Sequence, residues 1–169
     1  MRRFVLPIAA VLLAGLAACG PSDKPKPVDN GKASTTASKP LDAASAFTQL
    51  SGKVASAKLS GTVTAANDPN HLLGRPNQYT SKTTFTDSRI AAADVSGTQP
   101  GDVDRGGAIE VFADPAGAKA RAAYIQSIAK AMPAVAEYDY VHGTVVVRVS
   151  HYLTPAQTAA YKTAVDGLG

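Results

Sequence analysis

The residues with the widest chemical capacity gather in one stretch, residues 67–79, which reads NDPNHLLGRPNQY. An acid, amides, an imidazole and a phenol occur together there. The Arg75 guanidinium suits a carboxylate or phosphate because it can donate two parallel hydrogen bonds. A connection this long between predicted strands is typical of a binding loop. The candidate binding residues are Asn67, Asp68, Asn70, His71, Arg75 and Tyr79.

A purely structural interpretation of residues 67–79 stays open beside the functional one. Asn, Asp and Pro are also the residues that turns use. In this alternative the two X-Pro pairs form turns, and Leu72 and Leu73 close one end of a sheet. The residue types alone do not separate the two interpretations.

A catalytic alternative would use Asp68 or Asp87 with His71 as acid and base in a small extracytoplasmic enzyme. No pair of titratable residues shows a recognisable catalytic spacing, so binding without catalysis is the leading expectation and no catalytic residue is assigned. His142 and His151 flank a predicted strand and stand too far apart to share a metal ion. The sequence therefore predicts no metal site.

Cys19 is the single cysteine of the 169 residues. It follows a basic start and an apolar run over residues 4–18, which is too short to span a bilayer but suits the hydrophobic part of a signal peptide. Residues 16–19 read L-A-A-C and resemble the lipobox of bacterial lipoprotein precursors. The resemblance implies cleavage before Cys19, a covalent diacylglycerol on its thiol with no other cofactor, and a lipid anchor at the outer face of the cytoplasmic membrane.

Residues 20–40 are rich in Pro, Lys and Ser and predict a disordered tether. The expected domains are therefore a signal peptide over 1–18, the lipidated cysteine with its tether over 19–40, and one domain over 41–169. The whole chain carries a net charge of +4, yet residues 41–169 contain eleven basic and eleven acidic side chains. This balance predicts no nucleic-acid-binding face.

The elements expected after residue 41 define an α+β fold, in which a mainly antiparallel sheet carries about three helices on one face. Cap residues and apolar spacing predict helices over 42–54, 115–132 and 155–167. Alternation predicts strands over 58–65, 79–90 and 108–113, then either a hairpin or one kinked strand over 137–151. Tyr79, Ser81, Thr83 and Phe85 are expected on one face of their strand. The core side of the second helix is expected to present Tyr124, Ile125, Ile128 and Met132.

Three stretches resemble small lipoproteins of actinobacterial type: DPNHLLGRPNQYTSK, EVFADPAGAKARAAYIQSI and YDYVHGTVVVRVSHYLTPAQTAAY. Together they extend over most of residues 60–165. The resemblance implies an extracytoplasmic location and one shared domain, and it carries over no catalytic residue. The expected function is a non-catalytic binding or interaction module at the cell surface. Its expected partners are the membrane, through the lipid anchor, and a cell-envelope protein or wall polymer.

Overall fold

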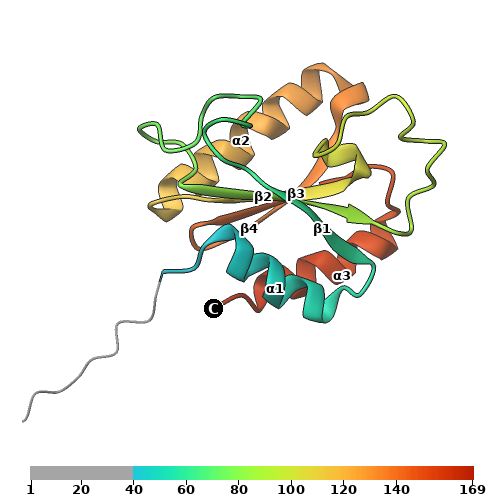
Figure 1. Cartoon of the computed structure of the whole chain (residues 1–169), viewed down its shortest axis with the longest axis horizontal. Helices are drawn as coiled ribbons and strands as arrows, with labels where there is room; N and C mark the ends of the chain where they lie inside the picture. The colour runs from blue at the N-terminus through green and yellow to red at the C-terminus, as the bar shows by residue number, and fades with distance from the viewer. Residues whose placement is uncertain (1–39) are drawn as a thin grey trace, which may run out of the picture. The chain divides into compact units, whose positions relative to one another are not determined.

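The computed structural model describes residues 40–169, and within them it confirms an α+β fold with a five-stranded antiparallel sheet (Figure 1). The predicted signal peptide, Cys19 and the tether as far as residue 39 lie outside the described residues. The α-helices are α1 (Ala43–Lys53), α2 (Pro115–Ala131) and α3 (Pro155–Asp166). The strands are β1 (Ala57–Thr62), β2 (Ser81–Asp87), β3 (Gly106–Val111), β4 (Glu137–His142) and β5 (Val145–Ser150). Two short 3-10 helices are η1 (Val103–Arg105) and η2 (Pro133–Val135).

The strands lie in the order β1-β2-β3-β5-β4, and every neighbouring pair is antiparallel. Strand β5 therefore lies between β3 and β4, which run parallel to each other and are connected through α2. Strands β4 and β5 form the hairpin, rather than one kinked strand. Gly143 has a φ of 54° at its turn, a conformation that glycine adopts without steric cost.

Helices α1 and α3 pack side by side on one face of the sheet and enclose the main core. Their starts are fixed locally, as the sequence predicts: the Asp42 carboxylate accepts from the Ser45 N–H at 2.8 Å, and Thr154 and Gln157 form a capping box. The sheet contributes alternating apolar side chains, with the Phe85 ring 5.6 Å from that of Tyr161. The predicted inward positions Val145, Val147 and Val149 are all buried in this core.

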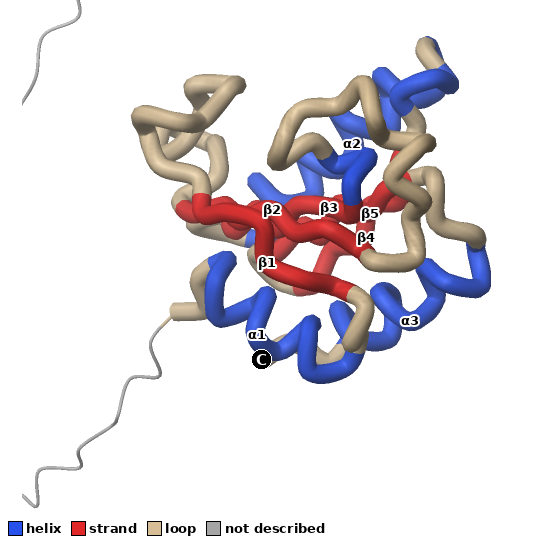
Figure 2. The backbone as a smooth tube through the Cα atoms, turned by 45° about the vertical axis from the view of Figure 1, so that its right-hand side comes forward, coloured by secondary structure: helices blue, strands red, loops and turns tan. Residues whose placement is uncertain are grey.

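Helix α2 lies on the opposite face of the sheet, as both views show (Figures 1 and 2). There Ala118 packs with Tyr79, Phe112 and Val146, and Val146 points away from its neighbours Val145 and Val147 because side chains alternate along a strand. The helices were expected on one face of the sheet. Helices α1 and α3 do lie on one face, whereas α2 covers the other. None of the helices in residues 40–169 is long and apolar enough to cross a bilayer.

Two residues expected on the core side of α2 point to solvent instead. Tyr124 is 59% exposed and Met132 is 53% exposed, so both predictions are wrong. Ile125 is buried as expected. The buried line of α2 passes through Ala118, Ala122 and Ile125, and Tyr124 stands about 100° around the helix from Ile125.

Candidate functional site

The 67–79 loop folds around the carboxylate of Asp68, which is buried. This carboxylate accepts hydrogen bonds from the backbone N–H groups of Leu72 at 2.8 Å, Leu73 at 2.9 Å and Asn70 at 3.2 Å. The Tyr79 hydroxyl donates to its two oxygens at 2.7 and 2.8 Å. Burial alone would raise the pKa of Asp68, but the bonds from Tyr79 and the backbone lower it to about 2.

Tyr79 anchors the other end of the loop. Its ring is fully buried, lies edge-on to Phe112 with centroids 6.3 Å apart, and has the Lys82 ammonium 5.1 Å from its centre. The ring therefore lies on the α2 face, whereas Phe85 lies in the α1/α3 core. The expectation that Tyr79 shares a face with Phe85 is wrong, because pairing in β2 begins only at Ser81.

The remaining candidates of the loop reach its surface. Asn67 is exposed but structural, since its side chain accepts from the Thr64 N–H at 2.6 Å and donates to the Thr62 carbonyl. Asn70, His71 and Arg75 are exposed. A hollow of about 230 Å³ brings His71 and Arg75 beside the edge of Asp68. The structure therefore brings three of the candidate binding residues together, but the carboxylate of Asp68 already accepts hydrogen bonds from Tyr79 and the loop backbone.

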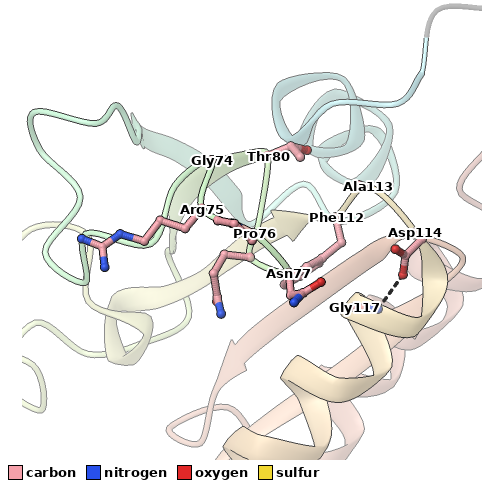
Figure 3. A pocket seen from close by; sticks show the side chains of 10 residues that line it. Gly74, Arg75, Pro76, Asn77, Thr80, Phe112, Ala113, Asp114 and Gly117 are labelled. Atoms are coloured by element: carbon pink, nitrogen blue, oxygen red, sulfur yellow. Dashed lines mark hydrogen bonds between the residues drawn. The ribbon is translucent and has the colours of Figure 1, made fainter.

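A second hollow, of about 270 Å³, separates the end of the loop from the start of α2 (Figure 3). Arg75 lies on its rim, and its guanidinium extends away from the helix. At the helix start, Asp114 accepts from the Gly117 N–H at 2.8 Å. This carboxylate already occupies the position at which an anion would meet the helix N-terminus.

Asp87, the other candidate acid, joins α3 to the sheet. Its carboxylate accepts from the Tyr161 hydroxyl at 2.6 Å and the Ser56 hydroxyl at 3.0 Å, and Arg89 donates to both oxygens. Burial opposes ionisation, yet these bonds lower the pKa of Asp87 to about 2. At neutral pH the carboxylates of Asp68 and Asp87 are thus ionised and already accept several hydrogen bonds. Neither therefore has the pKa or the free position that a general acid or base acting with His71 would need.

A third hollow, of about 400 Å³ and thus larger than the two above, lies beside α2 and is called here the α2 hollow. It forms where the helix, the 67–79 loop, η2 and strands β4 and β5 meet. The apolar part of its lining is Leu72, Tyr124, Ile125, Ile128 and Val135. The polar part is Asn70, Arg121, Glu137 and Arg148. Its size falls at the lower end of the range for small-ligand pockets, and its mixed lining is typical of them.

Beneath the α2 hollow lies a chain of charges, called here the Glu110 network. Glu110 is fully buried and forms three ion pairs. The nitrogen-to-oxygen distances are 2.8 Å to Arg121, 3.1 Å to Arg148 and 3.3 Å to Lys82. Arg148 also donates two hydrogen bonds to the Glu137 carboxylate, at 2.6 and 2.8 Å. Burial disfavours the charge on Glu110, but Arg121 and the other two cations outweigh it and hold its pKa below the usual value.

Asp139 stands at the end of the Glu110 network. Burial raises the pKa of Asp139 to about 7, and the neighbouring Glu137 carboxyl adds to the effect. One oxygen of Asp139 accepts from the Gln126 amide at 2.5 Å, and the other is buried with no hydrogen-bond donor among residues 40–169. Asp139 itself does not line the α2 hollow.

None of the candidate site residues predicted from the sequence belongs to the Glu110 network. One signal was available, because Glu110 and Arg148 interrupt strands whose neighbouring positions are apolar. Their meeting depends on register, which pairs Lys82 with Glu110 and Arg148 with Asp139 across neighbouring strands. Arg121 joins them from a helix that covers this face.

In the part of the chain that the structure describes, no three or more His, Cys, Asp or Glu side chains are grouped to hold a metal ion. No protein-family model, curated protein or solved structure matches this chain. The site is therefore interpreted from its own geometry.

Proposed function

We propose that this chain is an exported, lipid-anchored protein whose domain over residues 41–169 is a non-catalytic binding module at the outer face of the cytoplasmic membrane. The anchoring part of the proposal is supported by the L-A-A-C sequence at residues 16–19 and by the Pro- and Lys-rich residues 20–40 that follow it. Such a tether lets a domain reach partners above the lipid headgroups. The expected partners are small ligands of the envelope, an envelope protein or a wall polymer.

The observation that carries the binding function is the α2 hollow. Tyr124 and Val135 are 59% and 49% exposed and both line it, so two large apolar side chains meet solvent at the same hollow. Arg121 and Arg148 lie at its floor and are almost completely buried. Apolar walls around a few fixed polar groups give both affinity and orientation to a ligand.

Anchoring is tested with Cys19→Ser in the full chain. The wild-type chain should incorporate a labelled fatty acid and shorten on processing, because the thiol is the acceptor of the lipid. The Ser variant should remain a longer precursor without label. Labelling of the variant at the wild-type level would exclude Cys19 as the attachment site.

Binding is tested by native extraction of the full chain from membranes, followed by mass spectrometry of what co-purifies. Tyr124→Ser should lose the captured material because it removes the largest exposed apolar side chain of the rim. Tyr152→Ser is the matched control, since Tyr152 is also exposed, at 41%, and does not line the α2 hollow. Equal capture by both variants would place the binding site elsewhere, first at His71 and Arg75.

A second candidate function, acid–base catalysis, has one observation in its favour: the raised pKa of Asp139 beside Glu137, close to the hollow. Against it, both oxygens of Glu137 are held by Arg148. The two functions are separated by incubating the extracted material with wild-type protein and with Asp139→Asn. Under the binding proposal both leave the ligand unchanged. A product formed by the wild-type protein alone would favour the enzyme.

A further inference from the structure

We infer that the α2 hollow selects a small anionic amphiphile, that is, an apolar body carrying one carboxylate or phosphate group, and that Arg121 receives the anionic group. The inference rests on the proposed binding function and adds the class of ligand. It follows from three features of the hollow: the donors left on Arg121, the pairing of both floor carboxylates with arginine side chains, and the apolar rim.

The Arg121 guanidinium has hydrogen-bond donors that no described residue uses. Its Nε and Nη2 donate to Glu110 at 2.8 and 3.2 Å, whereas its Nη1 makes no hydrogen bond to any described residue. The side chain is only 11% exposed, and it lines the α2 hollow. A guanidinium fixed in this way by a buried acid is already oriented, so a carboxylate or phosphate can bind without further ordering of the side chain.

The carboxylates of the floor, by contrast, are already paired with arginine side chains. Both oxygens of Glu110 accept from cations, and both oxygens of Glu137 accept from Arg148. A cationic ligand would therefore have to compete with Arg121 and Arg148 for these two carboxylates. The Glu110 network contains three cations, Lys82, Arg121 and Arg148, and two ionised acids, Glu110 and Glu137. It therefore carries one excess positive charge while Asp139 is protonated. The excess favours an anion.

The rim supplies the apolar half of the site. Tyr124 and Val135 are largely exposed, and Ile128, which also lines the hollow, is half-buried. Covering such side chains contributes about 25 cal/mol for each Å² of apolar surface removed from water. An anion without an apolar body would leave this contribution unused, so inorganic phosphate should bind more weakly than an aromatic phosphate.

The test uses probes that share one body and differ in the head group: 4-butylbenzoate, 4-butylphenyl phosphate, the neutral 4-butylbenzamide and the cationic 4-butylbenzamidine. The full chain is placed in phosphatidylcholine nanodiscs, and binding is measured by equilibrium dialysis at pH 6 against empty nanodiscs. We expect at least one anionic probe to bind about tenfold or more tightly than the benzamide, as a charge-assisted hydrogen bond provides. The benzamidine should bind most weakly.

Arg121→Gln should lower the affinity for the anionic probes to that for the benzamide, and it should leave the affinity for the benzamide unchanged. Lys119→Gln is the matched control, because Lys119 lies on the same helix, is exposed and does not line the hollow. Arg121→Lys serves if the Gln variant does not fold; it keeps the charge but loses the paired donors, so its preference for the anionic probes should fall. Repeating the dialysis with phosphatidylglycerol in the nanodiscs separates the sources: competition indicates a lipid headgroup, and undiminished probe binding indicates a free ligand.

Three results would overturn the inference. If all probes bind equally and Tyr124→Ser weakens all of them, the hollow binds ligands without selecting an anion, so the proposed function stands and this inference fails. A preference for the benzamidine would reverse the sign of the selection. If none of the probes binds, the ligand class is wrong, and the native extraction with Tyr124→Ser then decides separately on the proposed function.

Discussion

Tyr79→Phe should destabilise the domain because it removes one oxygen atom at the anchor of the 67–79 loop. The Tyr79 hydroxyl donates to the buried Asp68 carboxylate at 2.7 and 2.8 Å. Phe keeps the ring and its edge-on contact with Phe112, so the substitution leaves no large cavity. What is lost is one hydrogen bond to a charged acceptor that is shielded from water.

The expected loss follows from that bond. A hydrogen bond to a charged group contributes about 1.5–3 kcal/mol to stability. For a domain of this size each kcal/mol lowers the melting temperature by roughly 3–5 °C, so the total fall is roughly 5–15 °C. Three backbone N–H groups still hold Asp68 in the variant, which is why the loop should loosen without unfolding the sheet.

The pH dependence checks the cause. The pKa of Asp68 is lowered to about 2 in the folded protein, from an ordinary value of 3.8. A lowered pKa contributes stability that is present above the unfolded value and is lost as the pH falls towards the folded one. The difference between Tyr79→Phe and the wild-type protein should therefore be largest near neutral pH and should shrink below about pH 4.

Urea denaturation of the full chain, followed by circular dichroism at several pH values, measures this loss. Tyr124→Phe is the control, because the Tyr124 hydroxyl makes no hydrogen bond to a described residue and its ring is exposed. The control should stay within about 0.5 kcal/mol of the wild-type protein. If Tyr79→Phe is equally neutral, the hydrogen bond from Tyr79 to Asp68 does not stabilise the domain.

Three further perturbations test other parts of the fold. Gly107→Ala should cost more than about 2 kcal/mol in chemical denaturation, because the added methyl group would overlap the backbone carbonyl of Arg148; a fully stable variant would contradict this close strand contact. Asp139→Asn should leave stability nearly unchanged at pH 4 and raise it at pH 8, since the pKa of Asp139 is raised to about 7 and the wild-type protein loses the stability of the protonated form as the pH rises through that value; the same change at both pH values would refute the assignment. The double variant with Arg75→Ala and His71→Ala should alter the melting temperature little, since exposed side chains contribute within about 0.5 kcal/mol each, and a loss of several kcal/mol would show that they are buried.

Features that depend on neighbours along the chain could be predicted from the sequence alone. Helix starts were predictable because a cap and the N–H group it holds lie three residues apart, as at Asp42 and Thr154. The hairpin and its inward valines were predictable because strand side chains alternate and Gly143 permits the turn. The lipobox interpretation of Cys19 is of the same local kind, and it stays a prediction.

Which side chains of the loop and of α2 are buried depends instead on the tertiary structure. Tyr79 and Asp68 have the residue types of a binding loop, yet they pair with each other inside the protein because a buried carboxylate requires donors. Tyr124 has an apolar ring at a helical spacing that fits the core, yet it faces solvent. Helix α2 is rich in alanine, so its sequence defines its buried face weakly, and the sheet beneath it selects Ala118 and Ile125.

The α2 hollow is likewise a product of the tertiary structure. Glu110, Arg121, Glu137 and Arg148 come from four elements, and only strand order and register bring their charges together. Ion pairs act over a few ångströms in space, whereas these residues are up to 38 positions apart in the chain. The sequence alone does not show that these charges meet, because folding brings them together.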